Sequence, residues 1–268
     1  MSPFNPRDLL EGKVGGSPRS DDEDLPRMGF FEHLEEFRRR LIVSLLAVLI
    51  LFFVSWAWAP ELFEIVARPI RKVLPPGQNL SYTTLTEPFL MYFRVSMLAA
   101  VIAASPVILW QIWLFVSPAL YRREKKLVLP FVGIGFLFFL AGCAFGYFEA
   151  FPLVVAFLIG VGKPFNAVIT INEYLGTAAK VILGLGLVFE TPILIFFLAR
   201  IGIVSERWLL AKFKYAVLVI FIIAAVITPT PDVATQLVFA LPMILLYLLG
   251  IGIAWAFKKR DAPSAPRS

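Results

Sequence analysis

Three carboxylates in this sequence have unusual neighbours: one lies inside an apolar stretch, and two lie beside clusters of basic residues. The first, Glu190, lies ten residues before Arg200 inside an apolar stretch, so it is about 15 Å from the charged end of that stretch if the stretch is helical. An ionisable group at that depth is costly unless it is protonated, paired or hydrated, and it marks a candidate functional site. The structural alternative is a protonated carboxyl group that bonds a neighbouring helix.

The other two carboxylates stand beside clusters of basic residues. Glu36 precedes three consecutive arginines, Arg38, Arg39 and Arg40, and Glu124 is the only acid among the four bases of YRREKK. A helix-surface salt bridge from Glu36 to Arg40 explains the first pattern equally well, and simple charge balance can explain the second. Both acids could instead receive a cationic ligand, because the planar fork of an arginine bonds a carboxylate in bidentate fashion.

The composition indicates the class of protein that must position these residues. The chain has 268 residues, of which 59% are hydrophobic and 16% charged, whereas soluble globular chains have about 45–50% apolar and about 25% charged residues. Apolar runs of about 20 residues recur, and each is long enough to cross a bilayer as a helix. We therefore expect an all-α, polytopic membrane protein. A β-barrel would need short segments of alternating hydrophobicity instead.

Catalytic, metal-binding and nucleotide-binding motifs are absent from the sequence. The chain has one cysteine, Cys143, and one histidine, His33, so neither a disulfide within the chain nor a multi-histidine metal site can form. The segment GVGKPF at Gly160 lacks the first glycine and the final Ser or Thr of a phosphate-binding loop. We expect no enzymatic activity, no cofactor and no metal. The net charge of +6 is distributed as membrane topology requires, so we do not expect binding to nucleic acid.

Six transmembrane helices are predicted. Residues 1–28 are expected to form a disordered cytoplasmic leader, residues 29–257 the membrane domain, and residues 258–268 a cytoplasmic tail. The fifth span is short, since about 16 residues reach only about 24 Å as a helix. The predicted spans cover residues 41–59, 89–116, 127–148, 175–199, 213–228 and 237–257.

The distribution of Lys and Arg predicts the orientation of the spans. Basic residues cluster before span 1, between spans 2 and 3, between spans 4 and 5, and after span 6, whereas the alternate loops are poorer in them or mixed with acids. Loops rich in Lys and Arg stay in the cytoplasm, so both termini are predicted to be cytoplasmic. Near the opposite surface, Arg94 is expected to snorkel or to be paired. Gly142 and Gly146 are spaced for a close helix crossing, more often internal than between two copies.

Several motifs in the sequence together resemble the TatC family, the core receptor subunit of the twin-arginine (Sec-independent) protein translocase. They occur in order through all six predicted spans and cover most of residues 29–257. The matching stretches are HLEEFRRRL (33–41), TEPF (86–89), SPVILWQIWLFVSPALYRREKK (105–126), FGYFEAFP (145–152), FETP (189–192) and TPTPDVATQ (228–236).

The resemblance implies a fold and a function. The fold is a concave, glove-like bundle of six helices in the bacterial cytoplasmic (inner) membrane. The function is the export of folded proteins that carry an Arg-Arg signal peptide, driven by the proton-motive force without nucleotide. The implied partners are those signal peptides, single-span membrane proteins of the TatA and TatB type, the lipid bilayer, and further copies of this chain within a hetero-oligomeric complex.

The resemblance also implies roles for particular residues. Glu36 and Glu124 match the acids of the signal-peptide site, and Arg38 is the neighbouring family arginine. Counting back from Arg38 assigns the first of these roles to Glu36 instead of Glu35. Three further residues match polar positions on the concave face or at the contacts with partner helices: Glu190, Thr228 and Gln236.

Other functions were weighed against the translocase. A proton-coupled small-solute permease that uses Glu190 would be expected to show inverted repeats, and we see none between the two halves of the sequence. An intramembrane enzyme lacks the paired catalytic groups that it needs. A passive assembly scaffold would differ little in sequence from a receptor, and crosslinking of signal peptides distinguishes the two.

Overall fold

The computed structural model describes residues 30–72, 80–116, 128–162, 168–228 and 232–256. It divides into two compact units, Met1–Arg38 and Arg39–Ser268. The boundary falls inside α1, so the first turns of that helix belong to the amino-terminal unit. The predicted leader (1–28), the tail (258–268) and Glu124 lie outside the described residues. The arrangement of helices below concerns residues 39–268.

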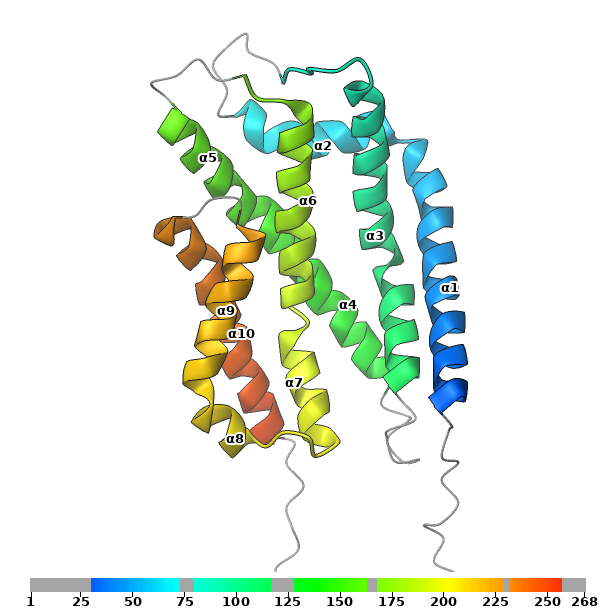
Figure 1. Ribbon diagram of the computed structural model, residues 1–268, viewed down its shortest axis with the longest axis vertical. Coiled ribbons are helices and arrows are strands. Elements are labelled where there is room, and N and C mark those ends of the chain that lie inside the picture. The colour runs from blue at the N-terminus through cyan, green and yellow to red at the C-terminus, as the bar shows by residue number, and fades with distance from the viewer. Residues whose placement is uncertain (1–29, 73–79, 117–127, 163–167, 229–231, 257–268) are drawn as a thin grey trace, which may run out of the picture. The chain divides into compact units, whose positions relative to one another are not determined.

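Helices form nearly all of the described structure (Figure 1), as the sequence predicts. The bounds of the elements are α1 (Phe30–Trp56), α2 (Ala59–Arg71), α3 (Glu87–Val116), α4 (Val128–Phe145), the π-helical turn η4 (Gly146–Ala150), α5 (Phe151–Gly162), α6 (Ile171–Val188), α7 (Thr191–Arg200), α8 (Glu206–Ala211), α9 (Phe213–Ile227) and α10 (Val233–Ala256).

The helices account for the six predicted apolar segments but differ from them in length. Among the residues that the structure describes, four helices can cross a membrane by length and composition: Glu87–Phe115, Pro130–Gly162, Ile171–Arg200 and Val233–Ala256. The pair α1 and α2, bent by 88°, gives a fifth candidate, and α9 is a shorter apolar helix. The third segment continues as a helix to Gly162, well beyond the predicted end at residue 148. A π-helical turn precedes Pro152 there, and such a turn bends a helix without ending it.

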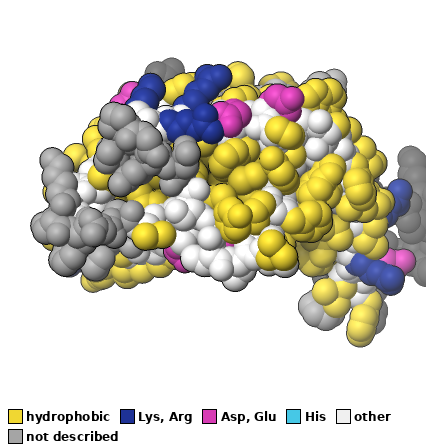
Figure 2. Space-filling view, turned by 90° about the horizontal axis from the view of Figure 1, so that it is seen from above, with side chains coloured by type: hydrophobic (Ala, Val, Ile, Leu, Met, Phe, Trp, Pro, Cys, Tyr) yellow, Lys and Arg dark blue, Asp and Glu magenta, His cyan; other side chains and the backbone are white. Residues whose placement is uncertain are grey.

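Apolar side chains cover much of the surface, as expected of a protein that faces lipid. Leu45 and Phe53 on α1, Ile222 on α9 and Leu245 on α10 are each more than half exposed. Soluble proteins rarely expose continuous apolar surface of this extent. Seen from the α2 end, the surface is mostly hydrophobic, and the visible charged side chains gather mainly along one edge (Figure 2).

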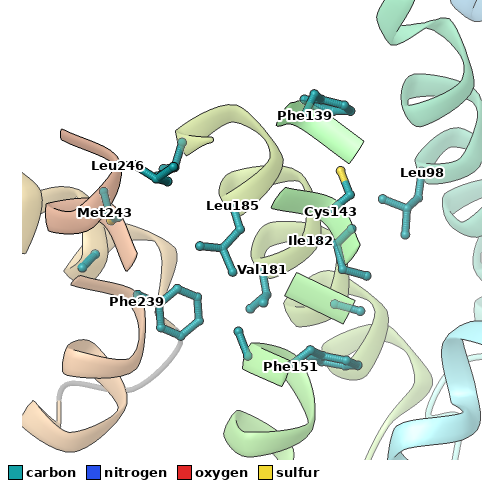
Figure 3. Packing of buried hydrophobic residues seen from close by; sticks show 14 of the residues in the cluster. Leu98, Phe139, Cys143, Phe151, Val181, Ile182, Leu185, Phe239, Met243 and Leu246 are labelled. Atoms are coloured by element: carbon teal, nitrogen blue, oxygen red, sulfur yellow. The ribbon is translucent and has the colours of Figure 1, made fainter. Parts of the chain in front are cut away.

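The buried core extends from α2 to α10, and its closest helix contact is the crossing of α4 and α6. A Cβ atom added to Gly142 would lie 2.5 Å from the carbonyl oxygen of Leu185, and one added to Gly186 would lie 2.6 Å from Cys143 Sγ. Glycine is required at both positions because it lets the two backbones approach. Gly146 likewise contacts the backbone of Ile182, so the predicted internal contact at this glycine pair is confirmed. Figure 3 shows Cys143, Ile182 and Leu185 within this packing.

Two side-chain hydroxyl groups donate hydrogen bonds to backbone carbonyls beside prolines. These carbonyls have no amide donor within the helix. A proline has no N–H for the carbonyl four residues earlier. Ser105 Oγ donates to Ile102 O (2.7 Å), the carbonyl that Pro106 leaves, and Thr191 Oγ1 donates to Val188 O (2.6 Å), the carbonyl that Pro192 leaves. These bonds satisfy backbone groups where no water is at hand, and they let helices bend inside the membrane.

Helix α2 was not predicted from the sequence. It lies across the ends of α3 and α6 (Figure 1), and Pro69 is inside it. Tyr147 Oη donates to Ile65 O (2.6 Å), the carbonyl that Pro69 leaves, and Tyr174 Oη donates to Val66 O (2.7 Å). Two tyrosines from other helices therefore hold α2 in place.

The connections at the α2 end are tied together by polar contacts. Ser81 and Thr170 form a β-bridge, with Ser81 N donating to Ile169 O (2.9 Å) and Ile171 N to Ser81 O (2.9 Å). Arg94 donates to the side chain of Asn172. Arg94 is therefore paired, which is one of the two alternatives expected for it.

Candidate functional site

The amino-terminal site residues lie on the first turns of α1. The side chain of Glu36 is only 16% exposed, and its Oε2 atom lies 3.9 Å from His33 Nδ1, whose side chain is 47% exposed. Glu32, Glu35 and Arg38 are exposed. Of the three acids on these turns, Glu36 alone is substantially withdrawn from solvent. Its predicted partner in the site, Glu124, lies in 117–127, outside the described residues, so the convergence of the two acids stays a prediction.

Glu190 lies at the break between α6 and α7. Its backbone forms the amino-terminal cap of α7, where Ile193 N and Leu194 N donate to Glu190 O (3.1 and 2.9 Å). Pro192 follows within the first turn of α7 and cannot continue the hydrogen bonds of α6. The FETP motif therefore places a carboxyl group at a helix break within a membrane span.

The carboxyl group of Glu190 packs against α4. Its Oε2 atom lies 3.2 Å from where a Cβ atom of Gly135 would be, so glycine at this position makes room for it. Its Oε1 atom is buried and has no hydrogen-bond partner among the described residues. A buried polar oxygen without a partner is destabilising, and this marks the Glu190 carboxyl group as a candidate functional group.

Thr228 follows the end of α9, and Gln236 lies in the first turn of α10. Thr228 Oγ1 donates to Ala224 O (2.8 Å) within its own helix, and Gln236 Nε2 donates to Phe221 O (2.8 Å), which ties α10 to α9. Each side chain keeps an oxygen that can accept a hydrogen bond. Within the described residues, no hydrogen bond joins either of them to Glu190.

Lys180 is a further candidate for a functional residue, and it was not among those predicted from the sequence. It is exposed on α6, nine residues after Ile171, and is therefore about 14 Å along the helix from that end. It is the only basic residue between Ile171 and Arg200, a signal that would have identified it. Lysine side chains at such positions commonly extend toward the membrane surface.

Comparisons with known proteins identify the family. A family model described as TatC, Sec-independent protein translocase protein, matches residues 32–242. The Sec-independent protein translocase protein TatC of Koribacter versatilis is 46% identical over 256 residues, which cover 92% of this chain and 94% of that protein. The protein of the same name from Helicobacter pylori strain J99 is 40% identical over 223 residues, which cover 83% of this chain and 87% of that protein.

Solved structures agree with this result. A crystal structure of the twin arginine translocase receptor TatC has 36% sequence identity and a TM-score of 0.73, and the match covers 84% of this chain and 99% of that one. A second crystal structure of that receptor, in DDM, has 35% identity and a TM-score of 0.75. These matches favour the translocase over the permease and the intramembrane enzyme. The chain belongs to the TatC family and is a multi-pass membrane subunit of the Sec-independent, twin-arginine protein translocase.

Proposed function

We propose that this subunit binds the Arg-Arg signal peptides of folded precursor proteins through Glu36 and Glu124, with Arg38 beside them. The observation that carries the assignment to Glu36 is its side chain, which is only 16% exposed, whereas Glu32 and Glu35 on the same turns are exposed. A carboxylate partly withdrawn from water forms a stronger charge-assisted hydrogen bond than an exposed one. Glu32 and Glu35 are assigned to the surface of the helix.

Two carboxylates suit two adjacent arginines. Each guanidinium group can make two parallel hydrogen bonds to one carboxylate, whereas the ammonium group of lysine is a point charge. The surrounding bases, among them Arg39 and Arg40, would otherwise repel a cationic signal peptide. The acids must therefore be local and well placed, and the site should distinguish an Arg-Arg pair from a Lys-Lys pair.

The second part of the proposal concerns the partner helices. Glu190, Thr228 and Gln236 contact single-span subunits of the TatA and TatB type within a complex that contains several copies of this chain. Two observations support this role: Glu190 Oε1 is buried without a partner among the described residues, and Gln236 donates one amide N–H to Phe221 O while its side-chain oxygen can still accept a hydrogen bond. A donor on a partner helix would satisfy either oxygen.

The third part is the location and orientation. We place the chain in the bacterial cytoplasmic membrane with both termini in the cytoplasm and the α2 end outside. The basic residues Arg200, Arg207, Lys212 and Lys214 lie in or beside the segments α7, α8 and α9, and the positive-inside rule assigns such segments to the cytoplasmic side. Membership of the TatC family implies that translocation draws on the proton-motive force, and the sequence has no nucleotide-binding motif.

Site-specific crosslinking tests the receptor site. A photoreactive residue at position 36 or 124 is expected to capture an Arg-Arg signal peptide, and a Lys-Lys peptide at the same concentration is expected to be captured far less. Loss of one carboxylate in Glu36→Gln should weaken binding by about tenfold or more, because a hydrogen bond to a charged group contributes about 1.5–3 kcal/mol.

Glu35→Gln is the matched control, since it removes the neighbouring exposed carboxylate. It should leave the affinity for the Arg-Arg peptide nearly unchanged. Full affinity in Glu36→Gln together with a loss in Glu35→Gln would move the role to Glu35. Full affinity in Glu124→Gln would remove the second acid from the site.

A further inference from the structure

Helix α2 has the character of a helix that lies in the membrane–water interface. Its buried side carries Val66, Ala67 and Ile70, and its other side exposes Glu61, Glu64, Arg68 and Arg71. The apolar side packs against α3 and α5 of the protein itself, and the charged side faces away from them at the end of the spans, as expected of a helix at a membrane surface. The α2 end of residues 39–268 is therefore at the level of the lipid headgroups.

A cavity of about 290 Å³ lies directly beneath α2. Its walls come from α2, α3, α4, η4 and α6, and its lining includes Leu62, Val95, Leu98, Leu140, Cys143 and Ile182. Figure 3 shows Leu98, Cys143 and Ile182 on neighbouring helices. The only hydroxyl group in the lining, that of Tyr147, already donates to Ile65 O.

The chemistry of this lining favours an apolar ligand. A water molecule needs two to four polar partners to occupy a cavity, and an apolar cavity of about 150 Å³ stays dry and takes apolar ligands. Val95, Leu98, Cys143 and Ile182 are buried, whereas Ala144 is exposed. The cavity therefore has a closed apolar floor and a side that opens to the surface, where the bilayer lies.

The cavity is elongated along the helices. Its lining on α3 extends from Val95 to Ile102, and its lining on α4 and η4 extends from Leu140 to Tyr147. Seven residues of helix correspond to about 10 Å. The cavity thus begins under an interfacial helix and continues along the spans, which is the direction of an acyl chain in a bilayer.

A cation lies near the interfacial end of the cavity. Arg68 is exposed on α2, one turn after Ile65, which lines the cavity. The neighbouring Arg71 is in an ion pair with Glu64 (2.6 Å), whereas Arg68 has no ion pair within the described part of the chain.

We propose that this cavity is a phospholipid site: one acyl chain occupies the cavity, and the lipid phosphate is bound by Arg68. A guanidinium group binds phosphate in bidentate fashion, and phospholipids combine an anionic headgroup at the interface with an apolar chain below it. An apolar peptide segment would fill the cavity but would leave Arg68 without a partner.

Lipid retention tests the proposal. The chain is purified in mild detergent, and bound phosphatidylglycerol is counted by native mass spectrometry. Ala99→Phe and Ala144→Phe, which place a ring in the cavity from α3 and from its exposed side, are expected to remove the retained lipid. Arg68→Gln is expected to weaken retention by about tenfold, and the matched control Arg71→Gln to leave it unchanged. Equal retention in the wild type and all four variants would overturn the proposal.

The single cysteine allows a second measurement that needs no substitution inside the cavity, so a failure to fold cannot affect it. Cys143 lines the cavity, so a small apolar maleimide should label it in delipidated protein about tenfold faster than in protein supplied with phosphatidylglycerol vesicles. Arg68→Gln should lose most of this protection. An unchanged labelling rate on adding lipid would contradict the proposal. Protection by an Arg-Arg signal peptide but not by lipid would also contradict it and would identify the occupant as a peptide.

Discussion

At the residue scale, the polar groups inside the spans divide into those that the fold uses and those that it leaves available. The hydroxyl groups of Ser105 and Thr191 bond backbone carbonyls beside prolines, and the amide group of Gln236 joins α9 and α10. Glu190 differs, because a buried oxygen of its side chain has no partner among the described residues. This difference supports a functional role for Glu190 and a partly structural role for Gln236.

The role of Glu190 is tested by two substitutions. Glu190→Gln keeps the size of the side chain and one acceptor oxygen but removes the charge, whereas Glu190→Leu removes the acceptor. If Glu190 accepts a hydrogen bond from a partner helix, the Gln variant should export a twin-arginine reporter nearly as well as the wild type. Export of the reporter by the Leu variant should fall by about tenfold or more, since a buried hydrogen bond is worth about 1–3 kcal/mol.

Export is measured in cells that lack the native subunit, with the amount of protein in the membrane equalised. Leu194→Ala, an exposed position one turn further along α7, is the control and should have no effect. A Gln variant as inactive as the Leu variant would contradict the acceptor role and would indicate that ionisation of the carboxyl group is required.

At the element scale, the crossing of α4 and α6 depends on the absence of side chains. The glycine spacing on α4 predicted a close contact, but it did not identify α6 as the partner helix. By contrast, Gly133 on the same helix α4 has open space where a Cβ atom would be. The two positions therefore separate the effect of crowding from the intrinsic effect of alanine in a helix.

Gly142→Ala should destabilise the protein by about 1–3 kcal/mol, because the added methyl group meets the backbone of α6 and the helices must move apart. Gly133→Ala should be neutral or stabilising by up to about 1 kcal/mol, since alanine favours helix over glycine. The thermal unfolding midpoint in detergent measures both. Equal midpoints for the two variants would show that α4 and α6 do not cross at Gly142.

At the scale of the whole molecule, the proposed orientation places the α2 end outside and the α8 end in the cytoplasm. Leu85 and Ile203 lie in the connections at these two ends and are 91% and 67% exposed. In a Cys143→Ala background, a membrane-impermeant maleimide should label Leu85→Cys in intact spheroplasts and Ile203→Cys only in inverted vesicles. The reverse pattern would contradict cytoplasmic termini.

Hydrophobic length and charge were sufficient to predict the all-helical membrane class, six apolar segments and the short α9, because the bilayer imposes these properties on each segment separately. The family motifs added the candidate residues Glu36, Arg38 and Glu124. Helix α2 was missed because its two prolines favour a loop, and the hydroxyl of Tyr147, 82 residues from Ile65, compensates for one of them.

The sequence by itself therefore determined which segments enter the membrane and which family they belong to. Only the tertiary structure decided which faces meet: the crossing of α4 and α6, the packing of Glu190 against Gly135, and the cavity beneath α2. The physical reason is that lipid is as apolar as a helix interface, so a transmembrane helix can be apolar on all sides, and its hydrophobic pattern then carries little information about its neighbours. Side-chain size and hydrogen bonding between distant residues make that choice.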